Sequence, residues 1–239
     1  MSRQPRFILP GQPQHVIQRG NNRDVIFTSD EDYKFYLEKL AAACTRFDCK
    51  LHAYVLMTNH VHLLMTPESK DGIGKVMQSI GRYYVQYFNY QYKRTGTLWE
   101  GRYKATLLDS ENYLLTCYRY IEMNPVRAAM VDHPSEYPWS SYRCNAVGEL
   151  NNLITAHELY LALGDNQQER GKFYRGLFDS QIEARELNEI RDATNKSWVL
   201  GTSRFKDRIE ALTARQVAPK GKGGDRKSKK YKENKINRV

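Results

Sequence analysis

Apolar and polar residues recur along residues 14–124 with two periods, one typical of strands and one typical of helices. Strand-like runs are expected at residues 15–19, 50–57, 60–65 and 98–108. The first run ends at the turn signal Gly20-Asn21-Asn22. Only Thr58 and Asn59 separate the second run from the third, so these two runs form either one bent strand or a hairpin.

Helical patterns fill the gaps between these runs, at residues 30–47, 72–92 and 110–124. Ser29 or Asp30 can cap the first helix, and Ser110 can cap the third. The third helix should end near Asn124, because a residue that precedes proline is disfavoured in helical geometry. The order β-α-β(β)-α-β-α predicts an α+β fold, with an antiparallel sheet covered by helices on one face.

The pattern changes after Pro134, where an aromatic connector leads into four shorter helical patterns. We therefore divide the chain into a catalytic domain at residues 1–135, a helical DNA-binding appendage at 136–213 and a disordered basic tail at 214–239. The tail holds ten Lys and Arg residues against Asp225 and Glu233, so it carries +8 of the formal net charge of +10. Such a segment has little to bury and is typical of a nucleic-acid contact.

Composition excludes several classes of protein. No apolar stretch approaches the ~18 residues of a membrane span, and the first residues lack the apolar region of a secretory signal. The four cysteines have no CxxC spacing, which argues against disulfides and a zinc knuckle. We expect a cytoplasmic, nucleoid-associated protein without a membrane partner.

Two histidines mark the candidate chemistry. His60 and His62 are two residues apart in a strand-like run, so their imidazoles project from the same face while Val61 points to the other. Two neutral imidazoles on one strand supply half of a metal site. Taken alone, this pair is a weak signal that needs a third ligand and a reactive group nearby.

The helix expected at residues 110–124 offers both. Tyr113, Cys117, Tyr120 and Asn124 follow one another at spacings of four, three and four, which places them on one stripe. That stripe presents a phenol with an amide oxygen one turn beyond it. A tyrosine that merely packs in the core is the ordinary interpretation of this pattern.

Five motifs in order along the chain resemble a known family. They are Gln18-Arg-Gly-Asn-Asn-Arg, Asn59-His-Val-His-Leu-Leu, Leu98-Trp-Glu-Gly-Arg-Tyr, Tyr120-Ile-Glu-Met-Asn-Pro-Val-Arg-Ala and Trp139-Ser-Ser-Tyr. This set is similar to the single-tyrosine HUH transposases, and more narrowly to the REP-associated tyrosine transposases. One departure is Thr58, where proline is expected in that family.

The resemblance implies a ferredoxin-like α+β core in which His60, His62 and Asn124 bind a metal and Tyr120 is the nucleophile. It favours Mg²⁺ or Mn²⁺, although the donor set would also accept zinc. The implied products are a 5′-phosphotyrosine and a free 3′-hydroxyl. A tyrosine phenol is largely un-ionised at neutral pH, so a metal or base must assist its attack on a phosphodiester.

Single-stranded or hairpin DNA is the expected partner, because attack needs an exposed strand. Side chains that could bind phosphates or stack bases are Arg19, Asn21, Asn22, Arg23, Arg82, Trp99, Arg102, Tyr103, Lys104, Arg226, Lys227, Lys229 and Lys230. Either a monomer or a homodimer is compatible with the sequence, with Tyr120 acting in its own subunit or in the partner's.

Three rival functions remain open at this point. The main one is a catalytically silent, domesticated protein that only binds DNA hairpins. A ferredoxin-like RNA-binding module would require RNP-type aromatic strands, which the sequence lacks. A metal hydrolase would need a carboxylate base, for which Glu122 is a weak candidate because it lies off the Tyr120 stripe.

Overall fold

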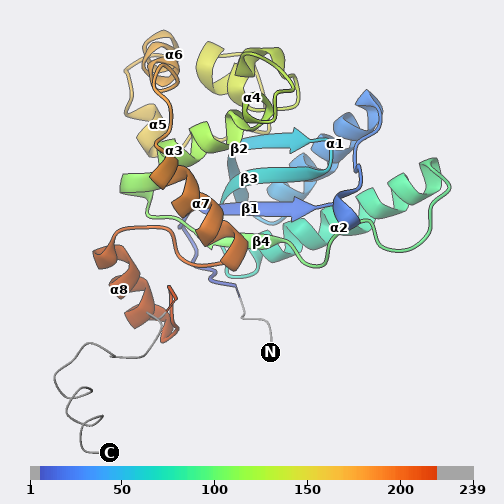
Figure 1. Ribbon diagram of the computed structural model, residues 1–239, viewed down its shortest axis with the longest axis horizontal. Coiled ribbons are helices and arrows are strands. Elements are labelled where there is room, and N and C mark those ends of the chain that lie inside the picture. Colours follow the sequence, from blue (N-terminus) through green and yellow to red (C-terminus); the bar gives the residue numbers. More distant parts are fainter. Residues whose placement is uncertain (1–5, 220–239) are drawn as a thin grey trace, which may run out of the picture.

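A four-stranded antiparallel sheet forms the centre of the protein. The computed structural model describes residues 6–219. The strands are β1 (Gln14–Arg19), β2 (Cys49–Met57), β3 (His60–Pro67) and β4 (Lys104–Leu107). Their spatial order is β2-β3-β1-β4 (Figure 1), which with the intervening helices is the ferredoxin-like arrangement predicted from the motifs.

The register of the sheet divides its side chains between two faces. Strands β2 and β3 form a hairpin joined by Thr58 and Asn59, so the hairpin alternative is correct. His62 lies opposite Val55 of β2 and Ile17 of β1. Because side chains alternate along a strand, this register places His60 and His62 together on one face.

Two long helices cover the other face, as the polar and apolar pattern predicted. They are α1 (Asp30–Arg46) and α2 (Gly72–Gln91). Their apolar side chains pack against Val61, Leu63 and Met65 of β3 in one buried cluster. Ser29 begins α1 through a capping box with Asp32, a pairing that satisfies backbone N–H groups at the helix start.

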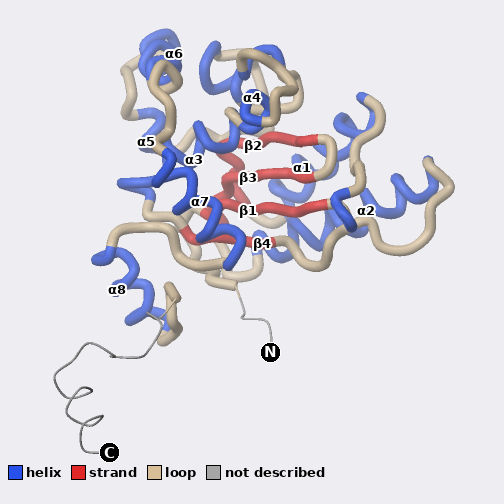
Figure 2. Tube along the Cα trace, viewed as in Figure 1, coloured by secondary structure: helices blue, strands red, loops and turns tan. Residues whose placement is uncertain are grey.

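The histidine face is covered by α3 (Ser110–Glu122) and α7 (Ala184–Lys196) (Figure 2). Ile121 of α3 and Ile190 of α7 share a buried cluster with Leu64 of β3. The tyrosine helix and a helix from the C-terminal half therefore form a second layer, opposite the predicted layer of α1 and α2.

The remaining helical elements are short. They are η1 (Asn21–Arg23), α4 (Asn124–Arg127), η2 (Pro134–Glu136), the π-helical turn η3 (Arg143–Val147), α5 (Glu158–Leu161), α6 (Gln167–Gly176) and α8 (Ser203–Thr213). The four helical patterns expected after Pro134 correspond to α5, α6, α7 and α8.

Residues 136–213 are attached to the sheet at several points. Ser140 and Ile154 form isolated bridges to β2, and Leu200 donates its backbone N–H to Leu107 O at 2.9 Å. This segment also shares the buried cluster beneath α3. The proposed boundaries at residues 135 and 213 stay predictions, and most of the predicted tail, residues 220–239, lies outside the described residues.

Two predicted boundaries differ from the structure. Within the strand-like run at residues 98–108, only Lys104–Leu107 forms a strand, because the chain turns at Gly96 and Gly101 with φ of 84° and 67°. The third helix stops at Glu122, and the new turn α4 begins at Asn124, with Pro125 in its first turn, where its missing N–H removes no helical hydrogen bond. Within residues 6–219, no helix combines the length and apolar character needed to cross a membrane.

Candidate active site

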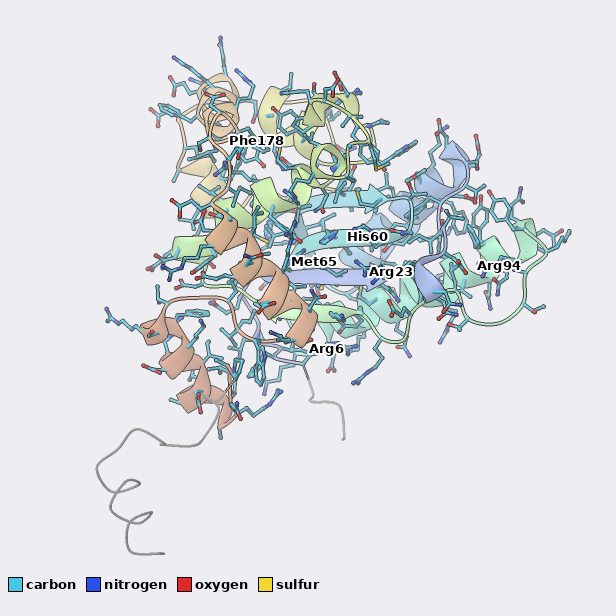
Figure 3. The ribbon with its side chains drawn as sticks, viewed as in Figure 1. Arg6, Arg23, His60, Met65, Arg94 and Phe178 are labelled. Carbon is cyan, nitrogen blue, oxygen red and sulfur yellow. The ribbon has the colours of Figure 1, made fainter. Side chains whose placement is uncertain are left out.

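The paired histidines lie at one end of the sheet. His60 begins β3 and faces Arg19, the last residue of β1, in the strand register. Figure 3 shows His60 and Arg23 at this same end of the sheet. The two imidazole rings of His60 and His62 have centroids 5.0 Å apart. The strand therefore brings both rings to one place, as the His-x-His spacing predicted.

Hydrogen bonds determine which nitrogen of His60 carries the proton. Asn59 Nδ2 donates to the carbonyl oxygen of Arg23 at 3.0 Å, which turns Asn59 Oδ1 toward His60. His60 Nδ1 lies 2.6 Å from that oxygen, which can only accept. His60 must therefore carry its proton on Nδ1, and this leaves the lone pair of Nε2 free for a metal.

His62 is more deeply buried and contacts a histidine from the neighbouring strand. His62 Nδ1 lies 2.8 Å from Nε2 of His15 on β1, and the two rings are tilted by only 16°. Burial lowers the pKa of His15 to about 3 and the pKa of His62 well below its usual value. Both rings are therefore neutral at pH 7, the form in which imidazole binds metals.

Tyr120 lies across these rings from α3. Its ring centroid is 5.8 Å from that of His62 and 5.6 Å from that of His15, in edge-to-face geometry. Tyr120 is 6% exposed, so its ring is held by the surrounding packing. The predicted nucleophile and the predicted ligand pair thus meet on one face of the sheet.

Arg127 of α4 completes this cluster. Its Cζ lies 4.5 Å above the ring centroid of Tyr120, and its Nη2 donates to the Tyr120 backbone carbonyl. Burial lowers the pKa of Arg127 to about 10, which still leaves the guanidinium charged at pH 7. A half-buried cation therefore lies directly beside the phenol.

Asn124, the predicted third ligand, lies one turn after Tyr120. Its Nδ2 donates to the carbonyl oxygens of Tyr120 and Ile121, at 2.9 and 3.1 Å. These bonds end α3 and leave Oδ1 as the atom that Asn124 can offer to a metal. Within residues 6–219, no three His, Cys, Asp or Glu side chains are grouped to hold a metal, so a metal at this site would need the amide oxygen or the substrate as a further ligand.

The donor types are ones that a divalent ion accepts. Two neutral imidazoles and one amide oxygen form a mixed set that suits Mn²⁺ and tolerates Mg²⁺ or Zn²⁺. Fewer than six protein donors leave positions for water and phosphate oxygens. Metal binding at this site, and the identity of the metal, stay predictions.

Most of the predicted phosphate-binding side chains lie on the surface. Arg19 and Asn21 are half-buried, and the exposed ones are Asn22, Arg23, Arg82, Arg102 and Lys104. Asn22 and Arg23 lie in η1 next to His60, with left-handed φ of 52° and 63°. The predicted tail contacts Arg226, Lys227, Lys229 and Lys230 lie outside the described residues.

The two aromatic candidates are buried. Trp99 is 7% exposed and stacks against Tyr84, with ring centroids 6.0 Å apart. Tyr103 is 9% exposed and lies under the Arg6 guanidinium, 3.6 Å from its ring centroid. Stacking of a base on either ring therefore requires this loop to open, and their role in binding DNA stays a prediction.

Three residues of the site were missed by the sequence analysis. His15, Arg127 and Thr194 each contact the site, but only Arg127 lies within a motif that the analysis quoted. His15 occupies an inward position of the first strand, where a polar residue was a usable signal. Thr194 lies in an ordinary amphipathic helix and gives no local sign of its role.

Glu122, the carboxylate considered for a hydrolase, serves a different purpose. It is fully buried and accepts hydrogen bonds from Ser141 Oγ at 2.6 Å, Asn145 Nδ2 at 2.8 Å and Tyr174 Oη at 2.6 Å. Both carboxyl oxygens are thereby engaged with the C-terminal half of the chain. This arrangement disfavours Glu122 as a base and indicates a structural role.

Glu122 should make the stability of the protein depend on pH. Burial raises its pKa from 4.5 to about 7, against the effect of its three hydrogen-bond donors. Between these values the unfolded chain loses the proton that the folded chain keeps, so the free energy of unfolding falls as pH rises, by about 3 kcal/mol in total. Urea denaturation at pH 4.5 and pH 8 should show a smaller difference for Glu122→Gln than for the wild type. An equal difference in both proteins would contradict this assignment.

Comparisons with known proteins agree with the fold and the motifs. Residues 12–124 match the family model described as "Transposase IS200 like". A structure described as a REP-associated tyrosine transposase bound to a REP hairpin has a TM-score of 0.52 and 19% identity, covering 66% of this chain and 93% of its own. A crystal structure from Deinococcus radiodurans R1, provisionally named a transposase, has 21% identity and a TM-score of 0.35, covering 50% of this chain and 96% of its own. No curated protein matches the sequence.

A ferredoxin-like sheet that carries these motifs in this order is similar to a transposase domain. Residues 12–124, just under half of the chain, are thus similar to the IS200-like transposase family. This match confirms the resemblance recognised from the motifs, and the core shares the fold of a REP-associated tyrosine transposase.

Proposed function

We propose that the protein is a metal-dependent single-stranded DNA endonuclease and strand transferase in which Tyr120 is the nucleophile. The single observation that carries the proposal is the position of the Tyr120 ring, 5.8 Å from the His62 ring on the same sheet face. A tyrosine that served only the core would not require beside it the His62 ring, which in turn lies next to His60.

His60, His62 and Asn124 would hold the divalent ion. When bound, that ion withdraws charge from a phosphodiester and fixes its orientation for in-line attack. The protein's own part is to hold the phenol against the ligand pair and to place Arg127 beside it. A cation in this position favours the negatively charged oxygen that attack requires.

The proposed reaction conserves bond energy. Tyr120 Oη gives up its proton and forms a bond to phosphorus, the bond from phosphorus to the 3′ oxygen breaks, and the leaving 3′ oxygen takes up a proton, so that no proton is gained or lost overall. The products are a 5′-phosphotyrosine and a free 3′-hydroxyl. A second 3′-hydroxyl can then attack the phosphotyrosine, which rejoins the strand and restores the phenol without ATP.

Single-stranded DNA with a hairpin is the proposed substrate. The similar structure described above was solved with a REP hairpin, and this chain carries Arg19, Asn22 and Arg23 at the His60 end of its sheet. These polar groups can bind phosphates on either side of the cleaved bond. The basic tail would add salt-dependent affinity for the same DNA.

Tyr120 and His62 meet within one chain, which supports attack in cis. We therefore propose that a monomer is sufficient for cleavage, with Tyr120 acting on DNA bound by its own subunit. This function would place the protein in the cytoplasm, on the nucleoid.

A covalent-adduct assay tests the proposed function. Purified protein is incubated with Mn²⁺ and end-labelled oligonucleotides, either single strands with a hairpin or the matching perfect duplexes. We expect a protein–DNA band on a denaturing gel with the single strands and not with the duplexes. Binding of every hairpin without cleavage of any would instead favour the catalytically silent hairpin-binding protein.

Arg127 provides a finer prediction. Arg127→Gln removes the positive charge beside Tyr120 and should lower the single-turnover cleavage rate by about 100-fold, with little change in the Kd for DNA. Arg127→Lys keeps a cation and should recover most of the rate. If the Kd rises as much as the rate falls, Arg127 anchors phosphate and does not assist the nucleophile.

A further inference from the structure

A hydrogen-bonded chain connects the C-terminal helix α7 to the paired histidines. Thr194 Oγ1 lies 3.1 Å from His15 Nδ1, and His15 Nε2 lies 2.8 Å from His62 Nδ1. The three side chains are 1%, 0% and 3% exposed, so solvent does not compete for these contacts. They join residues from three separate elements of the fold, α7, β1 and β3.

A backbone carbonyl at the far end sets the direction of every bond in this chain. The hydroxyl of Thr194 donates to Ile190 O at 2.7 Å, one helical turn earlier in α7. A carbonyl oxygen can only accept, and a threonine hydroxyl has a single proton. Toward His15, Thr194 Oγ1 must therefore act as an acceptor.

The role of Thr194 Oγ1 as an acceptor then determines which nitrogen is protonated in the rings of His15 and His62. His15 must donate from Nδ1 to Thr194, and because the ring is neutral, its Nε2 holds a lone pair. That lone pair accepts the proton on His62 Nδ1. His62 is left with an unprotonated Nε2, the atom on the opposite side of its ring.

We infer that Thr194 and His15 are positioning residues that fix His62 in the tautomer with a free Nε2 and so prepare it to bind a divalent ion. The inference rests on the proposed function for its consequence, since the ion belongs to that function, but the tautomer itself is a property of the metal-free protein. It assigns to the helical C-terminal segment a part in the catalytic site of the transposase domain.

The reverse direction fails at Thr194. If His15 donated from Nε2 to His62, its Nδ1 would need a proton from Thr194, whose only proton is used by Ile190 O. His62 would then carry its own proton on Nε2 and could not bind a metal through that atom. The other tautomer would thus leave the buried contact between His15 Nδ1 and Thr194 Oγ1 without a proton, and His62 Nε2 could no longer bind a metal.

The tautomers of His60 and His62 are set by residues from opposite halves of the polypeptide. Asn59, held by the carbonyl of Arg23 in the N-terminal half, sets the His60 proton on Nδ1 in the same way. Thr194 does so for His62 through one additional ring. Groups that orient metal-binding histidines typically change metal affinity by roughly 10- to 100-fold when they are removed.

Two substitutions of Thr194 distinguish the effect of its hydroxyl group from the effect of its side-chain volume. Thr194→Val keeps the volume and removes the acceptor, whereas Thr194→Ser keeps the hydroxyl and removes a methyl group. Metal-free protein with ¹⁵N-labelled histidine is studied by long-range ¹H–¹⁵N correlation spectra, which report which ring nitrogen is protonated. The His62 signal is identified by its loss in His62→Ala, and the Kd for Mn²⁺ alone is measured for each variant.

In the wild type and in Thr194→Ser, we expect both His15 and His62 to be protonated on Nδ1. Thr194→Val should shift both rings toward the Nε2 tautomer and raise the Kd for Mn²⁺ by about 10-fold. A wild-type His62 that carries its proton on Nε2, or tautomers unchanged in Thr194→Val, would overturn the inference. If the tautomers are as expected but the wild type does not bind Mn²⁺, the proposed metal dependence is wrong, whereas the role of Thr194 and His15 in setting the His62 tautomer is upheld.

Discussion

Replacing Tyr120 with phenylalanine is expected to lower strand cleavage by on the order of 10⁴-fold and to abolish the covalent adduct. The ring that packs against His15, His62 and Arg127 is kept, so the site should stay assembled. Affinity for a hairpin oligonucleotide should change little, because only one oxygen is lost. The measurement is single-turnover cleavage of a labelled hairpin, together with its Kd.

Tyr113→Phe is the matched control. Tyr113 lies on the same stripe of α3, but its hydroxyl donates to Glu189 Oε2 at 2.9 Å. This variant should cleave at nearly the wild-type rate. Equal losses in the two variants would show that the stripe matters for structure and would count against Tyr120 as the nucleophile.

Removal of the metal or of one of its ligands should have the next largest effect on activity. With EDTA, we expect cleavage to stop and to return when Mn²⁺ or Mg²⁺ is added. His62→Ala should lose about 10³-fold in rate, because a bound ion supplies several kcal/mol of charge stabilisation to the reacting phosphate. Unchanged cleavage in EDTA would contradict the metal-dependent mechanism.

Thermal unfolding gives a second measure of the same site. A metal at about 100 times its Kd should stabilise the wild type by ~2.7 kcal/mol and His62→Ala much less. His133→Ala serves as the control, because His133 is exposed in the turn before η2 and does not belong to the histidine pair. It should retain both the metal-dependent stabilisation and the cleavage rate.

Local patterns were sufficient to predict the core of the fold. The apolar period and the caps placed α1, α2 and α3 within a few residues, and the short Thr58-Asn59 connection allowed the hairpin. The period of two along β3 correctly placed His60 and His62 on one face. These features depend on neighbours in sequence, which is why they could be predicted.

Contacts between distant segments could not be predicted in this way. His15 and His62 are separated by 47 positions, and His15 and Thr194 by 179. Nothing near Thr194 distinguishes it from other threonines on an amphipathic helix. The covering of the histidine face by α7 is decided by packing of Ile190 and Ala193 against the sheet, and only the folded structure shows it.

Loops limited the prediction as well. The aromatic character of Trp99 and Tyr103 favoured stacking platforms, whereas the structure buries both rings. A short sequence motif does not reveal whether an aromatic side chain faces solvent or the core. Gly96 and Gly101, which turn the chain on either side of Trp99, were the local sign that this segment is not a continuous strand.

The central claim, attack by Tyr120 on a DNA phosphate, is tested most directly by the chemical identity of the adduct. The covalent complex formed with Mn²⁺ and a hairpin oligonucleotide is digested with protease and nuclease, and the modified peptide is sequenced by mass spectrometry. Our account predicts a 5′-linked nucleotide on Tyr120 and a free 3′-hydroxyl on the released strand. A 3′ linkage, an adduct on another residue, or cleavage without any adduct would contradict it.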